Sequence, residues 1–315
     1  MALGTNQVTT TIAGNFIPEL WSDEVIGAYK SNLVVANLVT KLNHKGKKGD
    51  TIHIPVPSRG SASVNTANAQ VTLSAATNTV LDVSIDKHYE YSKLIEDIAE
   101  VQSLASMRKF YTDDAGYALS KQVDTHLMNL SESAQSGGAG GGTTDFSFGG
   151  AYIGSGISAR WSGTNEADLS DAGIRAFNLL LDNADVPMDN RSLIIPPVCA
   201  SDLLATPRFT EQQMIGSGDA IRTGKIGMIY GVGVYVSTNC PTCKVGGGTG
   251  DGGAGTERVG VLMHKDAWVL AEQVGVRSQT QYKQEYLGDL FTSDTIYGIR
   301  ELRDDAVVAF VVPPS

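Results

Sequence analysis

The sequence predicts an α+β protein that places a long β-hairpin and a long helix ahead of a mixed domain of helices and strands. Two segments, 51–56 and 81–86, alternate apolar and polar residues as half-buried strands do. Between about 93 and 134 the apolar residues instead recur at helical spacing, with no proline to interrupt them. Short apolar runs and a capped helical segment then follow toward the C-terminus.

Length and composition are those of a folded globular protein. The 315 residues are 42% apolar and 18% charged, which excludes wholesale disorder. The formal net charge is −10 and the basic residues are scattered, so we expect no face that grips nucleic acid. No stretch approaches the ~18 apolar residues of a membrane span, and the polar, Thr-rich start does not resemble a secretory signal. We therefore expect a protein that works where it is made.

Residues 46–90 are expected to form an extended hairpin with one apolar stripe. The stretch 58–78 between its strands is rich in Ser, Ala, Thr and Asn, which suits an exposed tip. Two arms of about 20 residues would reach on the order of 60 Å, and an isolated two-stranded ribbon is only marginally stable. The stripe therefore needs a partner, and we expect a neighbouring copy of the same chain. The residues expected at this contact are Ile52, Ile54, Val56, Arg59, Leu81, Val83 and Ile85.

The helical stripe after the hairpin predicts a helix of about 40 residues, about 60 Å long. Gly116 is expected to bend or break it near the middle, and two ordinary helices joined near Gly116 are the alternative. A glycine-rich run at 136–142 follows and has the composition of a flexible joint. The hinge candidates are Gly116, Gly137 and Gly138.

The second half of the chain alternates between helix and strand patterns. Ser170 is expected to cap a helix that runs to Ala184. A buried strand is expected at 192–196, followed by a short helix around 201–205. The remaining strands are expected at 226–236, 259–264, 267–272, 276–286 and 306–312.

A search for catalytic or metal-binding patterns is negative. Cys240 and Cys243 form a CxxC, but a structural zinc needs two further ligands that no second CxxC or HxxxH supplies; a local loop disulfide or free thiols are the simpler interpretations. None of the five histidines belongs to an HExxH, and His126 on the long helix is expected to pack or to face solvent. There is no GxSxG, and the two phosphate-loop lookalikes, at 218–225 and 248–253, lack the required residues or context. We predict no enzyme activity, no cofactor and no metal.

The order of these segments resembles that of tailed-phage major capsid proteins with the Hong Kong 97 fold, over nearly the whole chain. Local phrases support the resemblance: GDTIHIP at 49–55, RSLIIPP at 191–197, GKIGMIYG at 224–231 and VYVS at 234–237. It implies an N-terminal arm at 1–45, an extended E-loop hairpin at 46–90 and a peripheral domain with the long spine helix at 91–169. It further implies an axial domain at 170–257 and C-terminal strands at 258–315 that return to the peripheral domain.

The resemblance implies a structural subunit that self-assembles, as pentamers and hexamers, into an icosahedral shell around double-stranded DNA. It places the protein in the virion, assembled in the host cytoplasm, with a portal protein, a separate scaffolding protein and an optional cement protein as partners. Some family members join neighbouring subunits through an E-loop lysine and an asparagine. Residues 49–86 contain no lysine, so we predict no such isopeptide bond. The alternatives are an encapsulin shell of the same fold and, from another class, a soluble hydrolase.

Overall fold

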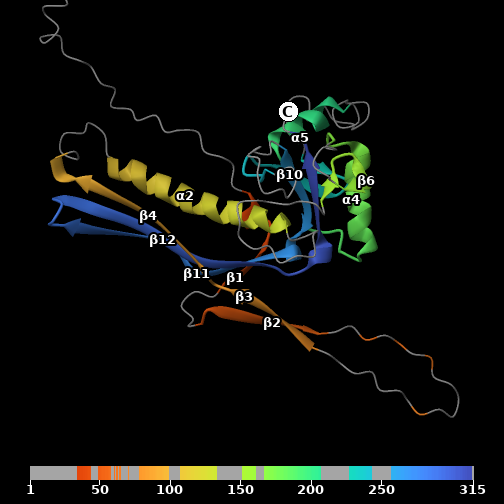
Figure 1. Cartoon of the computed structure of the whole chain (residues 1–315), viewed down its shortest axis with the longest axis horizontal. Helices are drawn as coiled ribbons and strands as arrows, with labels where there is room; N and C mark the ends of the chain where they lie inside the picture. The colour runs from red at the N-terminus through yellow and green to blue at the C-terminus, as the bar shows by residue number, and fades with distance from the viewer. Residues whose placement is uncertain are drawn as a thin grey trace, which may run out of the picture.

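The computed structural model has a compact lobe and two elongated projections (Figure 1). The structure describes residues 34–43, 49–57, 78–98, 107–132, 151–160, 167–206, 227–242 and 257–313, together with the single residues 60, 62, 64 and 70. The first 33 residues, most of the hairpin tip and both glycine-rich runs lie outside the described residues, as do Arg59, Gly137 and Gly138.

The compact lobe is a seven-stranded sheet in the order β6-β5-β13-β10-β7-β9-β8, with α4 and α5 on one face. The elements, in chain order, are β5 (Tyr152–Ile153), β6 (Gly156–Arg160), α4 (Asp171–Asn183), β7 (Arg191–Ile195), α5 (Pro197–Ala205), β8 (Met228–Ile229), β9 (Val232–Val236), β10 (Arg258–His264) and β13 (Val307–Val312). Its centre, formed by β7, β10 and β13, is almost wholly buried, because both faces of the sheet are covered. That explains the continuous apolar runs in these strands, where alternation would otherwise be expected.

One core cluster fills the space between the sheet and its two helices. Phe177 of α4 stacks on Phe310 of β13 at 4.9 Å between ring centroids, and Leu181 and Leu203 complete the layer. The predicted cap of α4 is confirmed, because the Ser170 hydroxyl accepts a hydrogen bond from the Gly173 amide at 3.1 Å.

The long projection is a four-stranded sheet in the order β1-β11-β12-β4, with α2 lying along one side (Figure 1). Its elements are β1 (Thr40–Asn43), β4 (Lys87–Glu96), α2 (Met107–Asn129), β11 (Trp268–Lys283) and β12 (Gly288–Glu301). Short 3₁₀ turns accompany them: η2 (Val35–Asn37), η3 (Leu130–Glu132), η4 (Lys265–Ala267) and η5 (Asp304–Ala306). A second core cluster joins this sheet, the C-terminal end of α2 and the other face of the compact lobe, with Trp268 and Leu127 at its centre.

The second projection is the hairpin of β2 (Thr51–Pro57) and β3 (Asn78–Ser84), which leaves the body beside β1 and β11 (Figure 1). Its two strands were predicted from their alternation, and both are confirmed. The pairing register sets Ile52 opposite Val83 and Ile54 opposite Leu81, so that the apolar residues share one face.

The structure differs from the predicted secondary structure at four places. The segment 93–96, assigned to the long helix, belongs to strand β4. Residues 97–98 are helical as predicted, and α2 is described from Met107, after residues 99–106 that lie outside the described part of the chain. The strands predicted at 267–272 and 276–286 are one continuous strand, β11, with bulges between them. The strand β12 was not predicted at all. The alternative of two helices meeting at Gly116 also fails, because α2 passes through Gly116 without a break.

The C-terminal residues 258–315, expected to return to the domain of the long helix, divide between the two sheets. Strands β10 and β13 lie at the centre of the seven-stranded sheet. Strands β11 and β12 instead build the four-stranded sheet of the long projection, called the long ribbon below. Strands β5 and β6, from the segment expected to belong with the long helix, also join the seven-stranded sheet.

Candidate functional site

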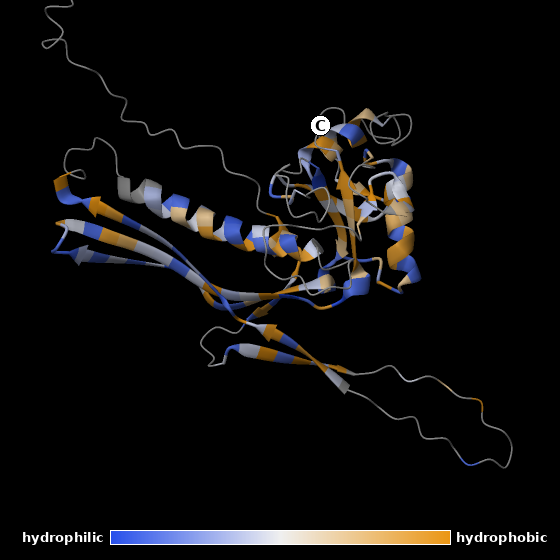
Figure 2. Ribbon diagram, viewed as in Figure 1, coloured by the Kyte–Doolittle hydropathy of each residue, from blue (hydrophilic) through white to orange (hydrophobic). Residues whose placement is uncertain are grey.

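The hairpin β2–β3 is the first candidate contact surface, and its two faces differ. One face carries Ile52, Ile54 and Val56 of β2, and apolar and polar bands alternate along the hairpin in Figure 2. The other carries His53 and Asp82, whose side chains are both exposed and lie 2.5 Å apart from Nδ1 to Oδ1. An amphipathic ribbon of this kind gains stability when its apolar face is covered.

The root of the apolar stripe is covered by the chain itself, which corrects part of the sequence prediction. Val83 is fully buried and Ile85 nearly so, in a small cluster with Val269 and Ala271 of β11. Both were expected to contact a neighbouring subunit, but burial within their own subunit leaves them no surface to offer. Ile52 and Ile54 are half-buried against the same cluster.

The stripe opens to solvent toward the hairpin tip. Val56 is 44% exposed, and Leu81 keeps partial exposure on the same face. Val80, on the opposite face beside Pro55, is 58% exposed. Arg59, the remaining predicted contact residue, lies outside the described residues. The surface available to a partner is therefore the outer half of the stripe.

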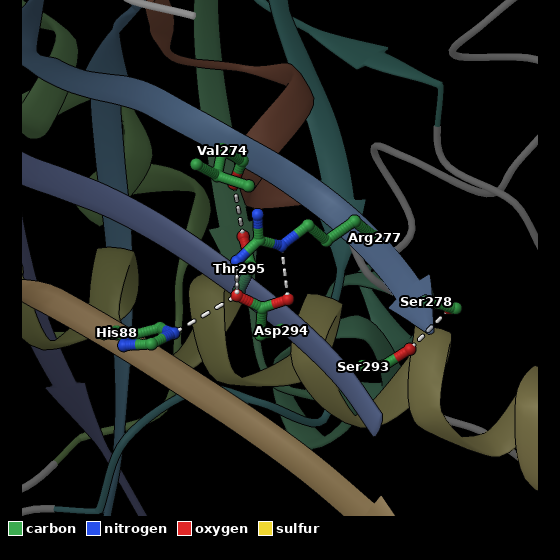
Figure 3. Close-up of polar contacts among 7 residues, drawn as sticks. All are labelled: His88, Val274, Arg277, Ser278, Ser293, Asp294 and Thr295. Atoms are coloured by element: carbon green, nitrogen blue, oxygen red, sulfur yellow. Dashed lines mark hydrogen bonds and ion pairs between the residues drawn. The ribbon is translucent and has the colours of Figure 1, made fainter. Parts of the chain in front are cut away.

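A cluster of charged side chains joins the strands of the long ribbon where the pairing of β11 with β12 is irregular (Figure 3). The Arg277 guanidinium donates to both oxygens of Asp294, at 2.7 and 2.8 Å, and the His88 ring lies 3.2 Å from the same carboxylate. These residues come from three adjacent strands, β11, β12 and β4. The hydrogen bond from Arg277 is the main cause that lowers the pKa of Asp294, so the carboxylate stays ionised.

The charge cluster lies beside two bulges in β11, between Glu272 and Arg277. The Thr295 hydroxyl donates to the carbonyl of Val274 at 3.0 Å, on the bulge itself. A bulge twists and bends its strand, and the surrounding bonds tie that bend to β12. The cluster therefore shapes the ribbon and is not arranged for catalysis.

The helix α2 is joined to the ribbon by a partly buried polar cluster. His126 Nδ1 lies 2.8 Å from the Tyr297 hydroxyl and its Nε2 lies 3.3 Å from that of Tyr89, while Gln122 lies beside the same ring at 2.8 Å. Burial lowers the pKa of His126 and raises that of Tyr297, which favours neutral side chains here. His126 packs, as expected from the sequence.

Asp124 of α2 forms a junction that sequence reasoning missed. Its fully buried carboxylate accepts hydrogen bonds from the amides of Val35 (2.9 Å) and Ala36 (3.2 Å) and from the Asn239 side chain (3.3 Å). Burial raises the pKa of Asp124. The carboxylate thus anchors the first described residues of the chain to the helix and to the loop after β9. The signal in the sequence was an acidic residue on the helix face that also carries Leu127 and Met128.

Gly116 and Cys240 are the predicted hinge and redox residues that the structure describes. Gly116 lies inside α2, and a methyl group built there would touch nothing within 4 Å; its role as a hinge remains a prediction. Cys199 and Cys240 are buried free thiols, so Cys240 is not part of a loop disulfide, and Cys243 lies outside the described residues. Burial raises the pKa of Cys240 to about 12, which disfavours the reactive thiolate.

In the part of the chain that the structure describes, no three His, Cys, Asp or Glu side chains are grouped to hold a metal ion. Within the same residues, no helix is long and apolar enough to cross a membrane. The structure instead supplies two projections. The hairpin has an exposed apolar face, and the four-stranded sheet has an edge that is only partly paired among the described strands.

Comparison with known proteins gives one consistent result. A family model described as phage capsid protein matches residues 37–283. Among curated proteins, no sequence matches the chain. Solved structures with the same fold include a chain of Mycobacterium phage Che8, at 23% identity and a TM-score of 0.73, over 94% of this chain and 97% of that one. A chain from the capsid of the cyanophage P-SCSP1u has 20% identity and a TM-score of 0.73, over 99% and 97%. A chain from the capsid of a native GTA particle has 11% identity and a TM-score of 0.60, over 98% and 100%.

Proposed function

This chain belongs to the phage capsid protein family, and we propose that the β2–β3 hairpin carries its contact with the neighbouring subunit in the shell. The chain is a non-enzymatic subunit of a tailed-phage capsid with an α+β fold like that of Hong Kong 97 capsids. The family match favours the phage capsid over the encapsulin alternative.

The observation that carries the proposal is the uneven burial of the hairpin stripe. Its root packs on β11 of the same subunit, which fixes the direction in which the hairpin projects. Its outer half, with the exposed Val56 and the partly exposed Ile54 and Leu81, keeps an apolar face in solvent. Each apolar side chain that a neighbour covers contributes a small free energy, about 25 cal/mol per Å², and a closed shell repeats that contribution at every subunit.

We propose subdomains that correspond to the two sheets. In this proposal the E-loop, expected at 46–90, ends before β4 begins at Lys87, and α2 with β1, β4, β11 and β12 forms the peripheral domain with its spine helix. The seven-stranded sheet with α4 and α5 forms the axial domain, which meets its copies at the centre of pentamers and hexamers. In this proposal β10 and β13 belong to the axial domain. The boundary predicted at residue 170 therefore separates the helices of the two domains but not their strands.

The partners and contents follow from the same assignment. We propose that the shell encloses double-stranded DNA, which fits a chain with a net charge of −10 that repels nucleic acid on average. A portal protein occupies one vertex, a separate scaffolding protein assists assembly, and a cement protein is an optional addition.

The experiment that tests this function is electron microscopy and size-exclusion chromatography of the full chain, alone and with its scaffolding protein. We expect closed shells in the megadalton fractions, or capsomers that elute well above the 33.3 kDa monomer. Val56→Asp is expected to prevent assembly while the subunit stays folded. Val80→Asp, at a valine that is also exposed but lies on the opposite face of the same hairpin, is the matched control. If Val56→Asp assembles as well as the control does, the hairpin face is not the contact.

A further inference from the structure

The base of the β2–β3 hairpin rests on the face of the long ribbon that is turned away from α2 (Figure 1). On β12, the Tyr297 side chain points to His126 of α2, so the next residue, Gly298, faces the hairpin. Gly298 is paired with Ala271 of β11, and Ala271 belongs to the small cluster that covers the root of the apolar stripe. Two small residues therefore leave a flat area on the ribbon where the end of β3 lies.

Gly298 permits a direct contact between the backbone of the ribbon and that of the hairpin. A Cβ built on Gly298 would overlap the carbonyl oxygen of Ser84 and lie 3.0 Å from the Cα of Ile85. Both atoms belong to the main chain, so no side-chain rotation can relieve the overlap. A larger residue at this position would lift the end of β3 by about 1 Å before ordinary van der Waals separations returned. The absence of a side chain at Gly298 thus sets the height of one hairpin strand above the ribbon.

The other hairpin strand is held at its base by Gln273 of β11. The Gln273 side-chain amide donates to the carbonyl of Gly49 at 3.1 Å, shortly before β2 begins. The Ile85 amide donates to the Asp50 carbonyl at 2.7 Å and closes the base between the two strands. The hairpin is therefore attached to the ribbon at two points, β3 at Gly298 and β2 at Gln273. A base held at two points cannot turn unless one of the two contacts changes.

A small displacement at this base produces a larger one at the outer end of the hairpin. Neighbouring strands lie about 4.8 Å apart, so lifting one strand by about 1 Å while the other stays fixed turns the base by about 10°. From Ser84 to Asn78 the strand β3 runs about 20 Å, and a turn of that size moves its far end by about 3 Å. The exposed apolar face around Val56 lies at this far end. Its orientation toward a neighbouring subunit therefore depends on the two contacts at the base.

We propose that Gly298 and Gln273 are positioning residues of the shell contact, which fix the angle of the hairpin and thereby the curvature at which neighbouring subunits close into a particle. Where unlike surfaces of identical subunits meet, the rotation between neighbours decides whether an assembly closes and with how many copies. The inference rests on the proposed hairpin contact, and it adds two residues outside that contact that determine its geometry.

Spin-label distances in the unassembled full chain measure the hairpin angle directly. The labels are attached at Asn78→Cys and Val276→Cys, both exposed positions, in a chain that also carries Cys243→Ser; the buried Cys199 and Cys240 are not expected to react. Gly298→Ala is expected to shift the mean distance by about 2–3 Å. Gln273→Glu keeps the side-chain size but replaces the donor to Gly49 by a carboxylate, and is expected to broaden the distribution; it also carries the test if Gly298→Ala does not fold. Unchanged distances in the folded variants would overturn the inference.

Electron microscopy of particles assembled from the same variants, without labels, tests the link to curvature. Gly298→Ala and Gln273→Glu are expected to shift or broaden the distribution of particle diameters, or to leave open sheets. The matched control is Gly260→Ala, whose Cβ would overlap the Phe310 ring in the compact lobe; it destabilises the subunit away from the hairpin and should keep the wild-type diameter. If both hairpin-base variants keep that diameter, or if Gly260→Ala changes it in the same way, the inference is wrong. The hairpin contact itself is tested separately by Val56→Asp, so the two failures can be distinguished.

Discussion

Replacing Val83 by alanine measures how firmly the hairpin is fixed to its own subunit. Val83 is fully buried against Val269 and Ala271. The substitution removes two methyl groups, worth about 1.6 kcal/mol at about 0.8 kcal/mol each, and leaves a cavity that adds to the cost. We expect the free energy of unfolding to fall by about 2–3 kcal/mol, a large share of the 5–15 kcal/mol typical of folded proteins.

The matched control is Val80→Ala, in the same strand and of the same residue type, but 58% exposed. We expect it to change the free energy of unfolding by less than about 0.5 kcal/mol. Both variants are compared by urea denaturation of unassembled subunits, where a shift of the midpoint at constant slope reports stability. If the two substitutions cost the same small amount, the root of the hairpin is not packed on β11, and the fixed direction of its projection is refuted.

Three further predictions concern the helix, the ribbon and the shell. Burial raises the pKa of Asp124, so its contribution to stability is greatest at acidic pH and declines as pH rises from the unfolded to the folded pKa. The variant Asp124→Asn should therefore lack that decline when the free energy of unfolding is measured against pH. A curve parallel to that of the wild type would contradict this. Gly116→Ala should stabilise the unassembled subunit by about 0.5–1 kcal/mol, because nothing crowds the new methyl group in the helix. Gly288→Ala should destabilise it strongly, since its Cβ would lie 2.5 Å from the Ile95 carbonyl oxygen. Thermal melts that rank the two variants in the opposite order would exclude this packing. Finally, because residues 49–86 contain no lysine, mature particles should run as a single monomer band in a denaturing gel, and a ladder of covalent oligomers would refute the prediction.

The parts of the fold that sequence predicted well are those in which local pattern and burial agree. The hairpin strands alternate apolar and polar residues because one of their faces packs and the other is exposed to solvent. The helix α4 begins directly after Ser170, because the hydroxyl of this N-cap residue accepts a hydrogen bond from the Gly173 amide in the first turn. Strand β13 is apolar throughout because the sheet is covered on both faces.

Strand β4 shows why one pattern was misassigned. Ile95 and Ile98 are three residues apart, which fits a helix, but Tyr89, Tyr91 and Ile95 also fit the period of two of a strand. Short segments satisfy both templates. The deciding factor is the pairing of β4 with β12, some 200 residues away in sequence, which no local pattern reveals.

The contact residues show the same limit. The stripe on the hairpin was visible in the sequence, but the division between its buried root and its open outer half was not. That division depends on Val269 and Ala271 of β11, which lie far away in the chain. The charge cluster around Asp294 was equally hidden, because it brings together three strands at a bulge.

The measurement that tests the central claim most directly is a cryo-electron microscopy map of the assembled particle at side-chain resolution. The account predicts that the apolar face with Ile54, Val56 and Leu81 lies against a neighbouring subunit, while Val83 and Ile85 remain packed on β11 of their own. A shell in which that outer face is open to solvent, with subunits joined elsewhere, would contradict it.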